Sequence, residues 1–324
     1  MTQKYDNVYI SSTSVVVGPY EKKGPLVKYF DYCYDDLYFG CKTFEQAEAF
    51  LLSKSLDILL EKCNKKIDLF ISSDLLNQLM SSSLVASKYK FPYLGVYSAC
   101  ASGIEGLIIA SNMISNGLSN VIASVSSHNN AAEKQFRNPV EYGGPKPKSS
   151  TFTVTGGVSA IVSTSGNIKV ESSTIGIVSD MGIRDVYNMG AVMASAAGDT
   201  IYKHLKDLNR SIDYYDMVFT GDLGVVGKKI LRDYMREEYN IVLKNYDDTA
   251  CMIYDFNKQS VYSGGSGPAC VMAVLYGYIF KKMLDHKWNR VLIVGTGSLH
   301  NTTLVNQKLS IPSIGHAISL EVSE

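Results

Sequence analysis

The sequence lacks any imbalance of charge, because 31 basic residues stand against 31 acidic ones in a chain of 324. Nothing in that balance attracts nucleic acid or an anionic membrane surface by bulk electrostatics. Hydrophobic residues make up 46% and charged residues 19%, which is typical of a globular protein with a sizeable core. We therefore expect no nucleic-acid partner.

Paired cysteines are also lacking. The six cysteines form no CxxC pair and have no zinc-like spacing. Scattered cysteines in a chain of this length favour a reducing compartment over a disulfide framework. The first residues, MTQKYDNVYISS, lack the basic and apolar segments of a secretory signal. We expect a cytoplasmic protein with no metal site and no cofactor.

No apolar run is long enough to cross a membrane. Two stretches contain no Asp, Glu, Lys or Arg. Residues 106–132 include many Ser and Asn, and in residues 259–280 only 269–280 form a continuous apolar run. A spanning helix needs about 20 apolar residues. Both stretches are therefore predicted as buried core helices, and any membrane association would have to come through partner proteins.

What the chain does contain is an internal repeat. IDLFISSDLLNQ (67–78) resembles YDMVFTGDLGVV (215–226), and SNVIASVSSHN (119–129) resembles NRVLIVGTGSLHN (289–301). The matches make Asp74 equivalent to Asp222 and relate His128 to His300. A Gly/Ser/Ala-rich turn before a long apolar segment also recurs in each half, so we infer a duplication.

Each half alternates short strand-like runs with helical segments, predicted at 42–63 in the first half and 199–208 in the second. This alternation is typical of an α/β protein with largely parallel, buried sheets. We place the division between the halves at residue 170, which gives units of 1–170 and 171–324.

Cys100 lies in YSACASGIEG (97–106), where an apolar run gives way to a helix. If the helix begins at Ala101, the thiol faces unpaired backbone N–H groups and the positive end of the helix dipole. That environment lowers a thiol pKa and attracts anions. The alternative is that Cys100 is a small buried hydrophobic side chain.

This cysteine, set in a duplicated α/β chain, resembles the thiolase superfamily of thiolases and ketoacyl-synthase condensing enzymes. The resemblance implies a five-layered fold of two similar halves, with Cys100 at the position of the acyl-accepting nucleophile. It also implies His or Asn helpers at TGDLG (220–224) and SGGSGP (263–268), where this chain has none. None of its histidines is expected at a helper position: His128, His204, His286, His300 and His316. A thiolate without a base or oxyanion donors condenses poorly, which favours a binding protein.

A closer resemblance covers nearly the whole chain. GPLVKYFD (24–31), SSDLLNQ (72–78), TFTVTG (151–156), GSGPAC (265–270) and above all SSHNNAAEKQFRNPVEYGGPKP (126–147) resemble the family of stage V sporulation protein AD, thiolase-like proteins of spore-forming bacteria. The resemblance implies non-catalytic binding of dipicolinic acid (pyridine-2,6-dicarboxylate) and a part in its uptake, with calcium, into the developing spore. It also implies membrane-embedded channel proteins as partners at the spore inner membrane, and a homodimer by analogy with other thiolase folds. The alternatives are an acyl-transfer enzyme that uses Cys100 and a structural subunit that docks on a channel.

A flat dianion needs hydrogen-bond donors at both ends of a narrow slot. Arg137 is the main predicted charge partner, because its planar fork grips a carboxylate with two hydrogen bonds. A salt bridge from Arg137 to Glu133 or Glu141 is the alternative. Lys146 and Lys148 are predicted as solvated loop charges. The predicted ligand-binding residues are Asp74, Asn77, Cys100, His128, Gln135, Arg137 and Asp222.

The two aspartates of the repeat are harder to reconcile with a dianionic ligand, because like charges repel. We expect Asp74 to hold Arg137 or His128 in place, rather than to share a proton with the ligand or to contact Ca²⁺. Asp222 either lines the same cleft or caps the turn before Leu223 and Gly224. His128 either donates to a ligand carboxylate or caps its own loop.

Overall fold

The computed structural model describes residues 1–137 and 146–323, and for Arg137 it describes the backbone only. Glu141 therefore lies outside the described residues, and so do the side-chain contacts predicted for Arg137. The described residues form a twelve-stranded mixed sheet in the order β11-β10-β13-β14-β9-β2-β8-β6-β4-β5, with β1 and β3 attached beside this path.

Each half of the chain contributes five strands to this path in the same order. The first set is β2 (Tyr9–Val17), β8 (Gly156–Ser163), β6 (Asn120–Ser127), β4 (Leu69–Ser73) and β5 (Tyr93–Gly95). The second is β9 (Ile168–Ile175), β14 (Ser313–Val322), β13 (Arg290–Ser298), β10 (Met217–Thr220) and β11 (Tyr246–Asp248). The duplication read from the sequence is thus visible in the topology. The division placed at residue 170 falls inside β9, whereas the matching strand orders divide the chain between β8 and β9.

The expectation of a largely parallel sheet is wrong. In both sets the first strand pairs antiparallel with the second and the second with the third, while the last three strands are parallel. Four short strands complete the sheets: β1 (Thr2–Lys4) pairs with β9, β3 (Tyr32–Cys33) with β2, and β12 (Gly265–Ser266) with β7 (Phe152–Thr153).

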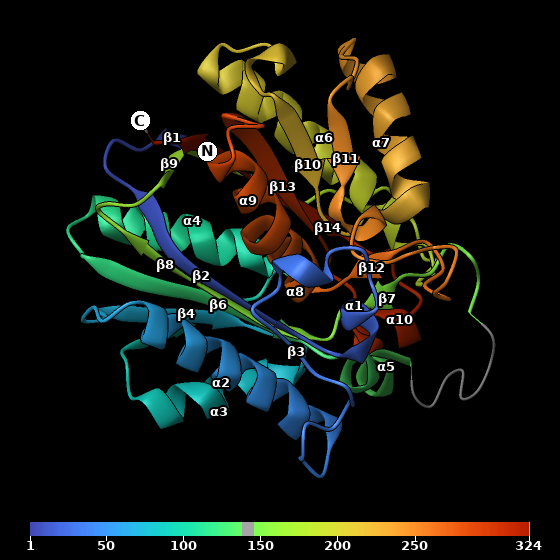
Figure 1. The fold of residues 1–324 in the computed structure, drawn as a ribbon. Coiled ribbons are helices and arrows are strands. Elements are labelled where there is room, and N and C mark those ends of the chain that lie inside the picture. The colour runs from blue at the N-terminus through green and yellow to red at the C-terminus, as the bar shows by residue number, and fades with distance from the viewer. Residues whose placement is uncertain (138–145, 324) are drawn as a thin grey trace.

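Helices form three layers around these strands (Figure 1). Helices α2 (Phe44–Lys62) and α3 (Met80–Tyr89) cover one outer face, and α6 (Met189–Leu208) and α7 (Gly224–Tyr239) cover the other. Helix α4 (Ser102–Ser115) lies between the two sets of strands, because it packs on β4, β6 and β8 from the first half and on β13 and β14 from the second. The expected five-layered arrangement is confirmed.

The central layer is continued by α8 (Pro268–Ala273), the π-helical η5 (Val274–Ile279) and α9 (Phe280–Leu284). Gly103 allows α4 and α8 to meet, because a Cβ there would lie 2.4 Å from the Met272 side chain. Shorter helical segments are α1 (Pro19–Lys22), η1 (Val27–Tyr29), η2 (Asn77–Leu79), α5 (Asn129–Arg137), η3 (Ile212–Tyr214), η4 (Thr249–Cys251) and α10 (Thr302–Asn306).

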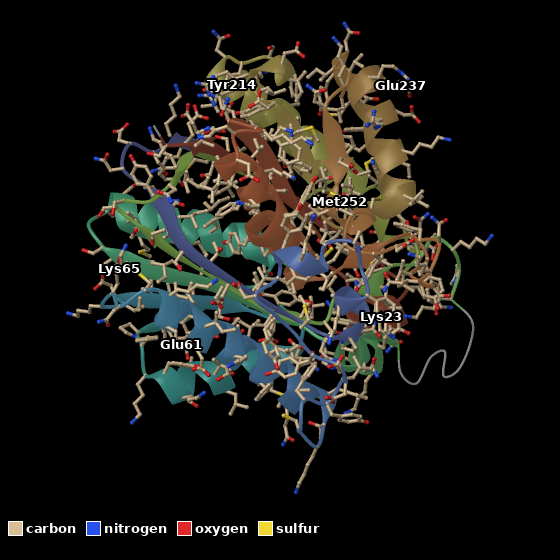
Figure 2. The ribbon with its side chains drawn as sticks, viewed as in Figure 1. Lys23, Glu61, Lys65, Tyr214, Glu237 and Met252 are labelled. Carbon is tan, nitrogen blue, oxygen red and sulfur yellow. The ribbon has the colours of Figure 1, made fainter. Side chains whose placement is uncertain are left out.

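The helix expected at 42–63 is α2, which begins after Thr43, whose hydroxyl accepts a hydrogen bond of 3.2 Å from the Gln46 N–H. The helix expected at 199–208 is only the second half of α6, since the run of small residues before it is helical as well. Charged side chains such as Lys23, Glu61 and Glu237, which are labelled in Figure 2, are exposed. Within residues 1–137 and 146–323, none of the helices combines the length and the hydropathy that a membrane span requires.

Candidate functional site

A small pocket, here called the Cys100 chamber, is lined by residues of α5, β7 and β12 and by the turns before α4 and α8. Its volume is about 40 Å³. Both halves of the chain contribute to its wall. The lining residues are Leu75, Tyr97, Ala99, Cys100, Ala132, Glu133, Phe136, Thr153, Met189, Ser266, Gly267, Ser298 and His300.

Cys100 reaches the chamber from the turn before α4. Ala99 has a left-handed backbone (φ 50°), and the Ser102 hydroxyl closes the turn by accepting from the Ser98 N–H (2.8 Å) and donating to the Ala99 carbonyl (2.7 Å). Burial, and next the negative charge of Asp222, raise the pKa of the Cys100 thiol well above its usual value, although the Gly267 N–H faces the sulfur. The expectation of a lowered thiol pKa is therefore wrong, because desolvation outweighs the backbone N–H groups near the helix start.

Ser298 and His300 enter the chamber from the end of β13 and the loop after it. The Ser298 side chain is 2% exposed, and among the described residues its hydroxyl has no hydrogen-bond partner. The His300 ring lies 5.1 Å from the Phe136 ring. Neither residue was among the predicted site residues, and His300 lies at neither of the two helper positions, 220–224 and 263–268, because it enters from the loop after β13. The repeat that paired His300 with His128 was the signal that could have found it.

Glu133 and Lys146 form an ion pair of 2.6 Å at the chamber wall, with side chains 24% and 18% exposed. Lys146 was predicted as a solvated loop charge, and that prediction is wrong. Lys148 is exposed, as predicted. Glu133 carries the one carboxylate among the described lining residues of the chamber, and the positive charge of Lys146 compensates it.

His128 precedes α5, is fully buried and is not among the lining residues of the chamber. Its Nε2 lies 2.8 Å from the Leu37 carbonyl oxygen, its Nδ1 accepts from the Asn130 N–H (3.2 Å), and its ring stacks on Phe44. Burial lowers the pKa of His128, so the ring stays neutral at physiological pH. Both ring nitrogens of His128 are hydrogen-bonded to backbone groups. His128 therefore caps its own loop, which was the alternative to donating to a ligand carboxylate.

Asp74 is a buried backbone cap. One carboxylate oxygen accepts from the Leu76 N–H (2.9 Å) and the other from the Ser82 N–H (2.8 Å), which ties the end of β4 to α3. Burial raises the pKa of Asp74. The hypothesis that Asp74 holds His128 is wrong, since the polar groups of His128 are bonded elsewhere.

Asn77 and Gln135 lie in an outer groove of about 250 Å³. Gln135 accepts from the Asn77 N–H (2.8 Å) and donates to the Leu75 carbonyl (2.7 Å), so it fastens this segment to α5. The outer groove is lined by Leu75, Leu76, Asn77, Gln78, Leu79, Tyr97, Gln135, Phe136 and Asn301. It shares Leu75, Tyr97 and Phe136 with the Cys100 chamber, so these three side chains form the partition between the two spaces.

Asp222 follows β10 and does not line the chamber; it is fully buried and has a left-handed backbone (φ 67°). The capping role suggested for it belongs to Asp248, whose carboxylate accepts from the Thr220 hydroxyl (2.6 Å), the Leu223 N–H (3.2 Å) and the Gly224 N–H (2.9 Å). Among the described residues neither oxygen of Asp222 accepts a well-formed hydrogen bond, and the Cys270 thiol lies beside it. Burial, and then the charge of Asp248, raise the pKa of Asp222 well above its usual value.

Of the predicted residues, the structure therefore brings only Cys100 into the chamber wall itself. In the part of the chain that the structure describes, no group of three or more His, Cys, Asp or Glu side chains is arranged to hold a metal ion.

Comparison with known proteins identifies a family for this chain. The model of the family Stage V sporulation protein AD matches residues 2–321. Stage V sporulation protein AD of Bacillus subtilis is 42% identical over 319 residues, which cover 97% of this chain and 94% of that protein.

Solved structures resemble the fold over nearly the whole chain. Cerulenin-bound OleA of Xanthomonas campestris has a TM-score of 0.59 at 13% identity, covering 98% of each chain. Human mitochondrial 3-ketoacyl-CoA thiolase in complex with CoA has a TM-score of 0.57 at 10% identity, covering 98% of each chain. FabH of Pseudomonas aeruginosa, a 3-oxoacyl-(acyl carrier protein) synthase III, has a TM-score of 0.55 at 8% identity, covering 98% of this chain and 99% of that one. These similarities show a thiolase-like fold.

Proposed function

Because the chain belongs to the Stage V sporulation protein AD family, we propose that it binds dipicolinic acid at the Cys100 chamber and does not transform it. The observation that carries this proposal is the Ser298 hydroxyl, which is 2% exposed, faces the chamber and has no hydrogen-bond partner among the described residues. A buried polar group left unsatisfied costs about 1–3 kcal/mol. A ligand carboxylate that accepts from Ser298 would remove this cost.

Other donors line the same wall. His300 and Tyr97 also line the chamber, and Lys146 offsets the charge of Glu133. Helix α5 ends at Arg137, directly after Phe136 of the partition. We retain Arg137 as the main proposed charge partner, since its guanidinium group has the geometry that a carboxylate prefers.

The chamber of about 40 Å³ is far smaller than the roughly 300–1,000 Å³ of ordinary ligand pockets. The outer groove adds about 250 Å³ on the other side of Tyr97 and Phe136. We therefore propose that binding moves these two rings and joins the chamber to the groove. The pyridine ring would then stack between them, and Asn77 and Gln135 would face its outer carboxylate.

The state of Cys100 supports binding over catalysis. Burial holds its pKa well above the usual value for a thiol, so it is protonated at physiological pH, and the thiol is a far weaker nucleophile than the thiolate. A neutral, small side chain suits the wall of a pocket for a dianion.

A second candidate function, acyl transfer by Cys100, is favoured by one observation: His300 lines the same chamber as Cys100. A histidine within reach of a cysteine is the usual means of activating it. We rank this second because the thiol lies in an environment that opposes ionisation.

Calorimetric titration of dipicolinic acid, with and without Ca²⁺, into the wild type and the Ser298→Ala variant tests the proposal. We expect the substitution to weaken binding about tenfold, or 1.4 kcal/mol. The matched control is Ser111→Ala, which removes a buried hydroxyl that donates to the Leu107 carbonyl inside α4. A wild type that does not bind dipicolinate would refute the proposal, and labelling of Cys100 by an acyl-CoA would support the second candidate.

The wider role is also a proposal. Dipicolinate would be handled as the free acid or its calcium chelate, and delivered to membrane-embedded channel proteins at the spore inner membrane. Affinity for dipicolinate that is the same with and without Ca²⁺ would exclude the chelate as the preferred ligand.

A further inference from the structure

A row of aromatic rings and lysines, here called the aromatic–lysine row, joins three segments that are far apart in the sequence. The Tyr29 ring of η1 lies 5.1 Å from the Tyr278 ring of η5, and the Tyr278 ring lies 6.0 Å from the Trp288 ring, measured between ring centres. The lysines that accompany these rings are Lys28, Lys282 and Lys287.

The lysines of the row lie over ring faces. Lys282 lies between two rings, because its Nζ is 5.9 Å from the centre of the Tyr29 ring and 5.6 Å from that of Tyr278. The Nζ of Lys28 is 5.2 Å from the centre of the Tyr29 ring. An aromatic face attracts an ammonium group at these distances but carries no net charge. The contacts therefore position the lysines without neutralising them.

The positive charge of the row is not compensated by carboxylates. The Nζ of Lys287 lies 5.2 Å from the centre of the Trp288 ring. In the part of the chain that the structure describes, none of the three lysines of the row forms a salt bridge, whereas Lys281 pairs with Asp285 at 2.9 Å. The row thus presents three free positive charges beside one neutral pair.

The rings of the row are fixed by the core beneath them. A Cβ at Gly277 would lie 3.0 Å from the Tyr29 carbonyl oxygen, so η1 packs directly on η5. The Trp288 ring lies 5.4 Å from the Phe219 ring, and the three rings of the row are partly buried against the core. Tyr278 belongs to the π-helical turn η5, and such turns are rare and occur frequently at functional sites.

Aliphatic side chains flank the row. Val27 precedes Lys28 and is 37% exposed, and Leu284 on α9 is 43% exposed. Tyr and Trp rings prefer the headgroup level of a bilayer, where one side of the ring is apolar and the other is wet. Lysines beside them are attracted to anionic headgroups. An acidic protein surface would match the lysines but would place the aliphatic side chains against charged groups.

We propose that the aromatic–lysine row is a contact surface for a bilayer that contains anionic lipids. None of its residues lines the Cys100 chamber or the outer groove, so the inference goes beyond the proposed function and does not rest on it. The sequence predicted membrane association through partner proteins because it has no spanning segment, but contact at the surface requires none. A net charge of zero does not oppose this contact, because charges act only within a Debye length of about 8 Å at physiological salt.

Trp288 allows a direct test, because it is the only tryptophan of the chain and belongs to the row. The full chain is mixed with vesicles of roughly one third phosphatidylglycerol and two thirds phosphatidylcholine. We expect the protein to sediment with these vesicles, and we expect lipids brominated near the headgroup end of their acyl chains to quench the Trp288 fluorescence. Vesicles of phosphatidylcholine alone should bind far less protein.

The test variant replaces the three lysines of the row with glutamine, and we expect its affinity for the anionic vesicles to fall about 100-fold. The matched control removes the same number of charges at exposed positions outside the row, through Lys66→Gln, Lys90→Gln and Lys229→Gln. It should bind the vesicles like the wild type. Equal losses in the two variants would show that only the overall charge matters and would overturn the inference.

Three results with the wild type alone would also overturn it. The first is a failure to bind the anionic vesicles. The second is binding without quenching of Trp288, which would place another surface on the lipid. The third is quenching of Trp288 by a polyglutamate peptide but not by vesicles, which would assign the row to an acidic protein segment.

Discussion

Glu133 and Lys146 are joined by an ion pair of 2.6 Å at the wall of the Cys100 chamber. The pair links α5 to the chain that leads into β7, and Lys146 also lies 5.6 Å from the centre of the Tyr262 ring. The lysine therefore sets the charge of a chamber wall that would otherwise be negative, which matters for any anionic ligand.

Removal of this lysine should weaken binding of an anion. In Lys146→Ala the Glu133 carboxylate remains uncompensated, and we expect the dissociation constant for dipicolinate to rise about tenfold. Lys134→Ala is the control, because Lys134 also belongs to α5 but pairs with Glu45 at 2.6 Å away from the chamber lining. Equal losses in both variants, measured by calorimetry, would show that only the overall charge matters.

The two histidines of the repeat should behave differently. His300→Ala removes a chamber donor, so we expect about tenfold weaker dipicolinate binding with little change in stability. His128→Ala removes a buried ring that bridges Leu37 and Asn130, so we expect a loss of about 2 kcal/mol in the free energy of unfolding. Urea denaturation and calorimetry on both variants separate the two effects, and a reversed pattern would show that the wrong histidine has been placed in the site.

Asp248 should contribute far more to stability than its neighbour Asp222. Asp248→Ala leaves the Thr220, Leu223 and Gly224 donors without their acceptor, and we expect a loss of about 3 kcal/mol. Asp222→Asn breaks no such bond and should leave the urea midpoint unchanged or raise it, more at pH 8 than at pH 5. Comparable losses in the two variants would contradict the assignment of the cap to Asp248.

The stability of the fold should fall as the pH rises from about 5 to 8. Burial raises the pKa of Glu21 and of Asp248 to about 7. A carboxyl whose pKa is raised by folding binds its proton more tightly in the folded state, so its contribution is fully present below the unfolded pKa and is lost as the pH rises through 7. One such group accounts for up to about 3 kcal/mol. Glu21→Gln should flatten the curve of unfolding free energy against pH, and an unchanged slope would show that Glu21 ionises freely in the folded protein.

The edge of the sheet at β5 is where we expect two copies of the chain to pair. In the described part of the chain β5 has β4 as its only partner strand, and Leu94 on β5 and Leu84 on α3 are 41% and 52% exposed. An open edge with apolar neighbours favours strand pairing between chains. Leu94→Lys should shift a dimer toward monomer in sedimentation velocity, whereas Leu309→Lys, at an exposed position outside the sheet, should not. A wild type that is monomeric at all concentrations would contradict the homodimer.

Much of the fold was predictable from local patterns. The echo between residues 67–78 and 215–226 marks β4 and β10, and the echo between 119–129 and 289–301 marks β6 and β13, because equivalent strands repeat their apolar runs. The antiparallel pairs that involve β8 and β14 were not predictable, since a buried strand is apolar whichever way its neighbours run.

What the sequence determined by itself was the duplication, the family, the α/β layers and the place of Cys100 at the start of a central helix, because these follow from periodicity and motifs along the chain. Only the tertiary structure decided which polar side chains share a space with that cysteine. Ser298 and His300 line the same chamber as Cys100 because β13 packs on the first-half helix α4. His128 and Asp74 are instead bonded to backbone groups of their own half. Equivalent positions in a repeat have the same backbone, but the surroundings of each half decide whether a side chain faces a chamber or a carbonyl.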